Sequence, residues 1–297
     1  MTKVPPERMG YEETLEAVEE SLQTLGVKVL SCVLIHWPGR TWAHRHSDPP
    51  CVVSRADAPG DWTGCRQATW EALVEAKRRG WVRHIGVANY ELPHLEEMSS
   101  PPEVIQMEFH PWWRRDDILK YAKQYGVEVV AYGSLGGKDA QLLGEPRLQQ
   151  FAARSSLSSV AQLLLSWASV QGIAVIPSAR SKKHQKENLY CCSISLLPKE
   201  AMSFLSTIPP EEQHRTLEPD PRFIYSPRST TANLAGPAPM ENRRVDPVFG
   251  SVDSLRAAPV VEGGCWMQGF GPDPCCMLNY GLEGHQGCWD GGFTFIR

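Results

Sequence analysis

The sequence predicts an α/β fold built on a parallel sheet. Strand-like and helix-like segments alternate through most of the chain, which is the order of repeated strand–helix units. The segment 29–35 is apolar apart from Ser31, as expected of a strand that is buried on both faces. The segment 11–25 places its apolar residues on one face and ends at Gly26, which indicates an amphipathic helix with a glycine stop.

Hydrophobic periodicity and turn residues place the other elements in the same alternation. The strands are expected at 29–35, 84–88, 104–108, 127–132 and 173–177. The helices are expected at 11–25, 67–79, 92–98, 116–125, 157–170 and 181–189. Helix 67–79 ends in basic residues and Gly80, in agreement with the rules for helix C-termini. We expect this helix to bury Trp70, Leu73 and Val74.

The composition argues against nucleic acid and membranes as binding partners. The 297 residues carry a formal net charge of -4 with both signs interspersed, so no basic patch indicates nucleic acid or an anionic membrane as a partner. No apolar run approaches the roughly 18 residues of a membrane-spanning helix, and the N-terminus lacks the charged-then-apolar order of a secretion signal. We therefore expect a cytoplasmic protein with a small-molecule site.

Two segments interrupt the alternation. Residues 38–63 are rich in Pro, Gly, Asp and His without periodicity, and His44 and His46 within them either border a substrate or belong to a plain surface loop. From residue 227 onward helix periodicity vanishes, so we divide the chain into a domain at 1–226 and an irregular Gly/Cys/Trp-rich tail at 227–297. The cysteine spacing in the tail contains no CxxC pair, and no metal site is predicted.

Two strand-end motifs carry the strongest functional signal. Residues 34–38 read LIHWP and residues 85–90 read IGVANY, each at the end of an apolar run. A single histidine at a strand end is most often a buried, hydrogen-bonded one. The two motifs in this order, however, resemble those of the aldo-keto reductases. The resemblance implies that His36 reaches the carbonyl of a substrate lined by Trp37, and that Asn89 holds the nicotinamide carboxamide.

The resemblance continues along the chain. Residues 104–111, VIQMEFHP, resemble the sixth strand of the family, which implies that Gln106 also bonds the carboxamide. Residues 129–136, VVAYGSLG, resemble the seventh strand, which implies that Tyr132 stacks on the nicotinamide ring and that Ser134 lies in the cofactor site. Residues 2–4 resemble the end of the third strand, where Lys3 matches the catalytic lysine.

The segment from residue 174 resembles the eighth strand and the helix after it. The resemblance implies that five residues there bind the adenosine end of the cofactor: Ser178, Arg180, Ser181, Glu187 and Asn188. The usual Lys-Ser pair of the family is replaced here by Ser178 and Ala179. Because Arg180, Lys182 and Lys183 still supply positive charge, NADP is favoured over NAD as the cofactor, although a solvated helix start explains these charges equally well.

The resemblance covers residues 1–226 and implies a (β/α)8 barrel of the TIM type, with about five of the eight β/α units present. The acid of the family is a tyrosine in a DxAxxY segment, which also carries the Asp that pairs with the Lys. No DxAxxY segment occurs in this sequence. We therefore expect an incomplete barrel, truncated at its N-terminal side and lacking half of the catalytic tetrad, with unpaired backbone groups and exposed apolar faces at its edges.

Two functions follow from these observations. The first is an NADP-dependent aldo-keto reductase that reduces aldehydes or ketones to alcohols by hydride transfer. The second is a catalytically silent remnant of the barrel whose C-terminal tail has an interaction role. The missing tyrosine decides between them.

Overall fold

Six strands form one parallel sheet whose spatial order, β1-β2-β3-β4-β5-β6, is also their order in the chain. The computed structural model describes residues 1–39, 62–137, 141–154, 157, 159–191 and 197–207. The strands are β1 (Thr2–Val4), β2 (Leu30–Ile35), β3 (Val82–Ala88), β4 (Val104–Glu108), β5 (Glu128–Tyr132) and β6 (Ala174–Val175). Sequential parallel neighbours are the topology of a (β/α)8 barrel wall. Within the described residues β1 and β6 each pair with a single strand, so the barrel is open, as expected.

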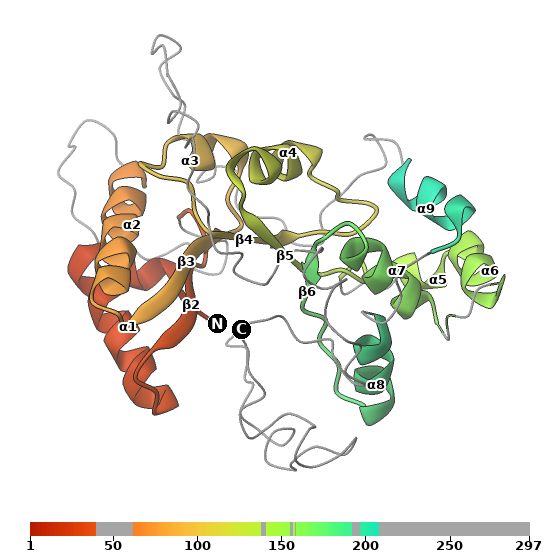
Figure 1. Cartoon of the computed structure of the whole chain (residues 1–297), viewed down its shortest axis with the longest axis horizontal. Helices are drawn as coiled ribbons and strands as arrows, with labels where there is room; N and C mark the ends of the chain where they lie inside the picture. The colour runs from red at the N-terminus through yellow and green to blue at the C-terminus, as the bar shows by residue number, and fades with distance from the viewer. Residues whose placement is uncertain (40–61, 138–140, 155–156, 158, 192–196, 208–297) are drawn as a thin grey trace, which may run out of the picture. The chain divides into compact units, whose positions relative to one another are not determined.

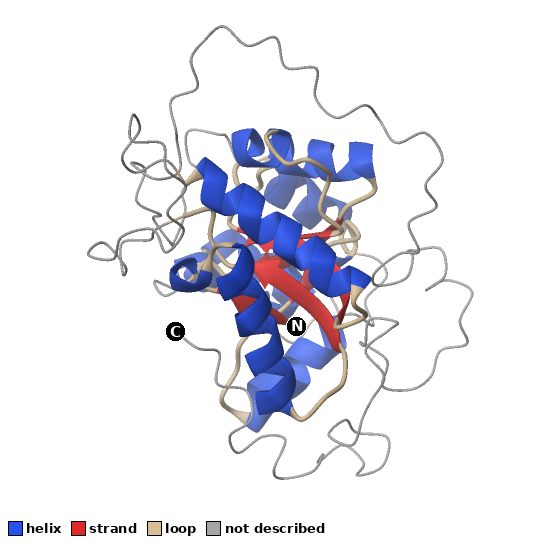
Figure 2. Cartoon of the chain, turned by 90° about the vertical axis from the view of Figure 1, so that its left-hand side faces the viewer, coloured by secondary structure: helices blue, strands red, loops and turns tan. Residues whose placement is uncertain are grey.

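Helices lie between successive strands along the chain, and two more of those described follow the last strand (Figures 1 and 2). Their bounds are η1 (Pro6–Arg8), α1 (Tyr11–Leu25), α2 (Thr63–Arg78), α3 (Leu92–Glu96), α4 (Asp116–Tyr125), α5 (Gln141–Gly144), α6 (Pro146–Arg154), α7 (Val160–Ser169), α8 (Lys182–Tyr190) and α9 (Lys199–Ser206). Figure 1 shows α1 beside α2, and α2 in turn contacts β2 and β3. This arrangement follows from the right-handed crossover that joins parallel strands.

Most predicted elements are confirmed, and three differences stand out. The segment 2–4, expected only as the end of a strand, is a paired strand, which makes six strands where five were counted. Strand β6 has two residues instead of the predicted five. The helices α5, α6 and α9 were not predicted. Most of the segment 38–63 and the whole of 227–297 lie outside the described residues.

One predicted core residue is wrong. Trp70 and Leu73 are buried as expected, but Val74 is 45% exposed. The buried stripe of α2 runs through Thr69, Leu73 and Ala76, spaced four and three residues apart. Val74 lies beyond the edge of this stripe because each residue turns about 100° around the helix axis.

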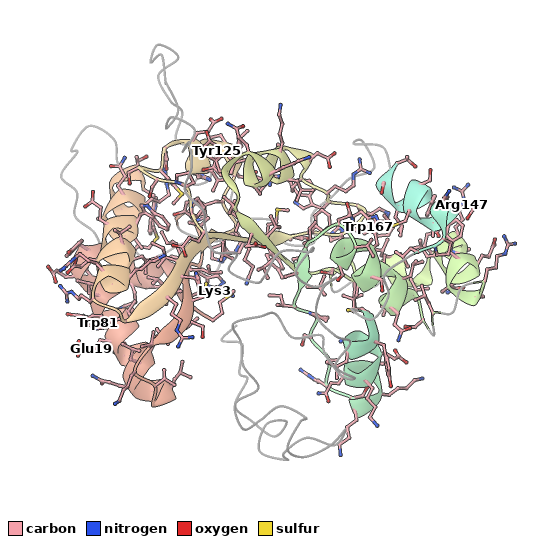
Figure 3. The ribbon with its side chains drawn as sticks, viewed as in Figure 1. Lys3, Glu19, Trp81, Tyr125, Arg147 and Trp167 are labelled. Carbon is pink, nitrogen blue, oxygen red and sulfur yellow. The ribbon has the colours of Figure 1, made fainter. Side chains whose placement is uncertain are left out.

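Alternation along the strands separates two faces of the sheet. The face toward the helices carries much of the main hydrophobic cluster: Val33, Ile35, Val87, Ile105, Met107, Val129 and Ala131. The same core includes Trp167 of α7, which is 0% exposed and stacks on Phe109 with 5.0 Å between ring centroids (Figure 3). These contacts fix the helices against the sheet and so hold the strand ends in place.

The opposite face, called the inner face below, carries the functional candidates. It presents Lys3, Leu34, Gln106, Glu108 and Tyr132, each out of phase with the helix-facing residues of its strand. Leu34, Val104 and Val130 on this face are each 0% exposed, but they belong to strands inside the sheet, so the expectation of exposed apolar faces at its edges stays a prediction. On the concave side of a barrel wall, side chains from neighbouring strands pack against one another.

Candidate active site

Lys3 and His36 are brought together by the pairing of β1 with β2. Lys3 lies opposite Leu34, and the main-chain N–H of His36 donates to the carbonyl of Val4 at 2.9 Å. Both side chains are half-buried. His36 follows β2 directly and lies two residues beyond Leu34, so Lys3 and His36 come close together at adjacent strand ends. The ring of Trp37 lies next to the His36 ring, with 6.1 Å between centroids.

Burial sets the charge behaviour of Lys3. Removal from water disfavours the ammonium and lowers the pKa of Lys3, and nearby Cys32 opposes this shift. Cys32 is a free thiol that is 0% exposed, and burial raises its pKa to about 12. Cys32 therefore packs as a small buried side chain inside β2. Because the pKa of Cys32 is raised to about 12, the thiol is neutral near neutral pH and supplies no negative charge to Lys3 there.

Asn89 follows β3 and joins the ends of three strands. Its Nδ2 donates to the main-chain carbonyl of His36 at 2.9 Å, and its main-chain N–H donates to the carbonyl of Gln106 at 3.0 Å. Its Oδ1 accepts from the hydroxyl of Tyr132 at 2.5 Å. The residue is 5% exposed and has a φ of 62°, in the left-handed region that asparagine adopts more readily than most residues.

The next two strands supply the rest of this group. Gln106 on β4 is 3% exposed, and its Nε2 donates to the sulfur of Met1 at 3.3 Å. Tyr132 ends β5 and is half-buried. Ser134 is also buried, and its hydroxyl donates to the carbonyl of Ala131 at 3.4 Å. Asn89, Gln106 and Tyr132 thus meet where the carboxyl ends of three parallel strands share one edge of the sheet.

The residues assigned to the adenosine end lie after β6: Ser178, Arg180 and Ser181 precede α8, and Glu187 and Asn188 lie in its second half. Ser181 is the N-cap of this helix, and its hydroxyl accepts from the main-chain N–H of His184 at 3.1 Å. Ser178 and Arg180 are exposed, whereas Glu187 and Asn188 are half-buried. A helix N-terminus flanked by exposed cations attracts anions. This segment could therefore bind a phosphate group. Lys183 also forms an ion pair with Glu187 at 3.9 Å.

Sequence reasoning gave no role to a buried acid–base pair beside this group. Glu108 is 1% exposed and lies opposite Tyr132 in the sheet register, and its Oε1 is 3.0 Å from Nε2 of His110, which is 0% exposed. Polar residues at 106, 108 and 110 in an otherwise apolar strand were the available signal. Such a spacing places all three on one face, and buried polar groups require partners.

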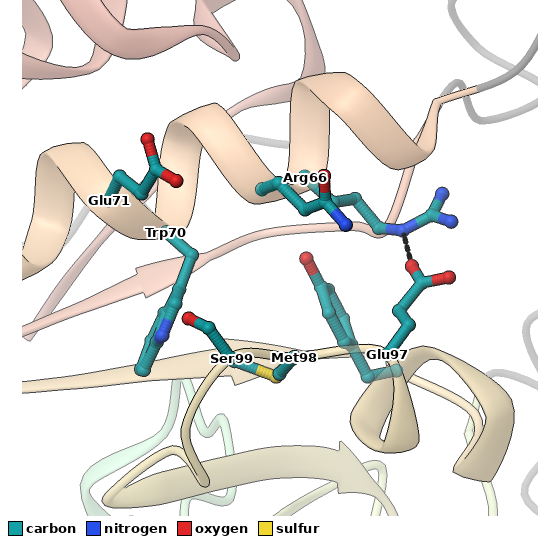
Figure 4. Close-up of a pocket in the computed structure, with 8 residues that line it drawn as sticks. Arg66, Trp70, Glu71, Glu97, Met98 and Ser99 are labelled. Atoms are coloured by element: carbon teal, nitrogen blue, oxygen red, sulfur yellow. Dashed lines mark hydrogen bonds and ion pairs between the residues drawn. The ribbon is translucent and has the colours of Figure 1, made fainter. Parts of the chain in front are cut away.

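A pocket of about 120 Å³ lies elsewhere, between α2 and the segment after α3 (Figure 4). It is lined by Arg66, Gln67, Trp70, Glu71, Tyr90, Glu97, Met98 and Ser99. Arg66 forms an ion pair with Glu97 at its rim and donates to the carbonyl of Pro38 at 3.0 Å. None of the predicted site residues lines this pocket, so it is separate from the candidate active site.

The part of the chain that the structure describes contains no group of three or more His, Cys, Asp or Glu side chains able to hold a metal ion. Within the same residues, every helix is too short or too polar to cross a membrane. His44 and His46 lie outside the described residues.

The sequence is similar to those of several oxidoreductases. The chain is 32% identical to an aldo/keto reductase of Synechocystis over 212 residues, which cover 64% of this chain and 61% of the relative. It is 34% identical to glyoxal reductase of Bacillus subtilis over 191 residues, or 63% of this chain and 60% of the relative. This chain therefore spans less than two thirds of the length of these relatives.

Solved structures agree with the sequence comparison. An aldo/keto reductase from Brucella melitensis superposes with a TM-score of 0.58 at 27% identity, over 69% of this chain and 71% of that one. A variant of Gox0644 in complex with NADPH has a TM-score of 0.57 at 29% identity, over 69% and 68% of the two chains. The family model described as "Aldo/keto reductase family" matches residues 1–208. With strand-end motifs ordered along sequential parallel strands, this match shows that the chain belongs to the aldo/keto reductase family.

Proposed function

We propose that this chain binds NADPH and serves the reduction of aldehydes or ketones to alcohols. The observation that carries the proposal is the meeting of His36, Asn89, Gln106 and Tyr132 at the carboxyl ends of β2 to β5. In barrels of this type the carboxyl ends of the strands carry the active site. The two sequence relatives described above are an aldo/keto reductase and a glyoxal reductase, which supports a reductase as the proposal for this chain.

The residues present fit a dinucleotide. Asn89 and Gln106 are buried amides, and each retains hydrogen-bonding capacity for a carboxamide. Tyr132 supplies an aromatic plane beside them. Ser178, Arg180, Ser181, Glu187 and Asn188 are the proposed partners of the adenosine end. The bound nicotinamide would supply the hydride, while the chain orients it and shields it from water.

On the substrate side, the chain offers a hydrogen-bond donor and a cation. His36 is proposed to orient the carbonyl oxygen of the substrate, with Trp37 lining the space around it. Lys3 is proposed to stabilise negative charge as it develops on that oxygen. A proton must still reach the oxygen, and no tyrosine of the chain lies in a DxAxxY segment.

A second candidate function rests on that last observation and on the open sheet. Among the described residues, β1 and β6 do not pair with each other, so the sheet stays open. The strands of the family that carry the acidic tyrosine are not part of this sheet. The chain would then be a catalytically silent member of the family, and the segment 227–297 would carry an interaction role.

The test measures NADPH binding by the full chain through quenching of tryptophan fluorescence, followed by NADPH oxidation with an aromatic aldehyde. Saturable NADPH binding that is weakened by Asn89→Gly supports the proposal. A chain with native circular dichroism that does not bind NADPH refutes it. Binding without any turnover favours the silent member of the family over the reductase.

A further inference from the structure

The side chain of Asn89 connects two neighbouring features of the site. Through Nδ2 it holds the main-chain carbonyl of His36 at 2.9 Å, and through Oδ1 it holds the hydroxyl of Tyr132 at 2.5 Å. His36 follows β2 and Tyr132 ends β5, so this one amide joins the ends of strands that are not neighbours in the sheet.

The geometry constrains Tyr132. Its backbone lies at the end of β5, its hydroxyl reaches the end of β3, and β4 runs between these two strands. The ring therefore extends across the carboxyl-terminal part of β4. A ring held at both ends loses the freedom to rotate away about its side-chain bonds, which prepares a flat surface before any ligand arrives.

The amide has capacity beyond these two bonds. An asparagine side chain offers two N–H groups and two lone pairs. One N–H is directed at His36 and one lone pair accepts from Tyr132, so one of each remains. Asn89 can hold both protein groups and still contact a carboxamide.

We propose that Asn89 is a positioning residue: by bracketing the His36 carbonyl and the Tyr132 hydroxyl, it holds the aromatic surface on which a nicotinamide ring stacks. This inference rests on the proposed function, because it specifies how NADPH is recognised there. The bracket explains why an amide that reaches in two directions stands at a left-handed position, where glycine would be the easiest choice for the backbone.

The test is a double-mutant cycle on the full chain with Tyr132→Phe, Asn89→Gly and both together. Phenylalanine keeps the ring and removes only the hydroxyl. Glycine removes the amide without straining a φ of 62°. Two probes are titrated: NADPH, and 2′-phospho-ADP-ribose, which has the same adenosine end but lacks nicotinamide.

In the wild-type background we expect Tyr132→Phe to weaken NADPH binding about 3- to 10-fold, because it removes one hydrogen bond. In the Asn89→Gly background the same substitution should change binding by less than about 2-fold, because its partner is already gone. Binding of 2′-phospho-ADP-ribose should stay within about 2-fold for all four proteins.

Two results overturn the inference. An equal loss from Tyr132→Phe in both backgrounds would show that Asn89 acts without Tyr132, and equal weakening of both probes would show a general structural defect. If the wild-type chain binds neither probe, the proposed function fails. Urea unfolding of the same four proteins then tests whether Asn89 and Tyr132 are coupled through their hydrogen bond. If the double variant loses less stability than the sum of the two single variants, the contact between Asn89 and Tyr132 is supported. A loss equal to that sum refutes the contact.

Discussion

Glu108 and His110 form a buried pair next to the candidate site, with 3.0 Å between Glu108 Oε1 and His110 Nε2 and no more than 1% exposure for either side chain. Glu108 ends β4 opposite Tyr132, and its Cγ lies 3.5 Å from where a Cβ on Gly133 would stand. Gly133 has a φ of 65°, in the left-handed region that favours glycine. The turn after Tyr132 therefore lies next to the Glu108 side chain.

Removing one member of the pair is expected to be costly. Glu108→Ala should lower the free energy of unfolding by roughly 3 kcal/mol, because it leaves buried His110 without this hydrogen-bonding partner and opens a cavity in a fully buried place. Glu108→Gln keeps a hydrogen-bonding group and should cost about 1 to 2 kcal/mol. Urea unfolding measures both, with Glu12→Ala on the exposed face of α1 as the control, expected within about 0.5 kcal/mol of wild type. Equal losses for Ala and Gln would contradict a role for hydrogen bonding here.

The raised pKa of Cys32 predicts a pH dependence of stability. Burial raises the pKa from 9.0 to about 12, so between these values the folded state holds a proton that the unfolded state has released. The contribution of Cys32 is fully present below about pH 9 and is lost as pH rises toward about 12, at a limit of about 1.4 kcal/mol per pH unit.

The measurement compares wild type with Cys32→Ala by urea unfolding at several alkaline pH values. The absolute stability of the variant also reflects the cavity left behind, so the slope against pH is compared. We expect a shallower decline in Cys32→Ala. Parallel slopes would show that the thiol ionises equally easily in both states.

The cations around the start of α8 are predicted to read the 2′-phosphate of NADPH. Replacing Arg180 and Lys183 together by Ala should weaken NADPH about 10-fold or more, because charge-assisted bonds to phosphate are lost. NADH lacks this phosphate, and its binding should be nearly unchanged. Lys186→Ala is the matched control, since Lys186 is exposed on the same helix. A similar loss of affinity for NADPH and NADH would show that Arg180 and Lys183 attract both negatively charged cofactors without contacting the 2′-phosphate.

The unpaired edges predict self-association. Strands β1 and β6 each have one neighbour among the described residues, and unpaired backbone groups at sheet edges favour pairing with another chain. Sedimentation velocity over a range of concentrations should show species larger than the monomer. A monodisperse monomer with one cooperative thermal transition would mean that the edges are covered.

The missing acid predicts at most a trace rate of aldehyde reduction. Loss of a general acid typically costs about 10²- to 10⁴-fold, and the Asp partner of the lysine is absent as well. Fusing a segment with the DxAxxY motif and its strands before residue 1 should restore NADPH oxidation, and His36→Ala should abolish the restored activity. Robust oxidation by residues 1–297 alone, dependent on His36 and Lys3, would show that another group donates the proton.

Sequence alone determined the alternation of strands and helices, apart from the pairing of β1 and the helices α5, α6 and α9, and it placed His36, Asn89, Gln106 and Tyr132 in or just after successive strands. Local patterns suffice for this, because periodicity reports burial and because parallel strands bring their carboxyl ends to one edge. The open sheet also followed from sequence, since about five β/α units do not close a wall of eight strands.

Tertiary structure decided which of these residues bond to one another. The contact of Asn89 with Tyr132 depends on the strand order and on how far a tyrosine reaches across β4, and neither is written in a local pattern. The pairing of Glu108 with His110 and the exposure of Val74 likewise depend on packing between distant segments. Periodicity states which face of an element is buried, whereas the partner on that face is set by register and side-chain reach.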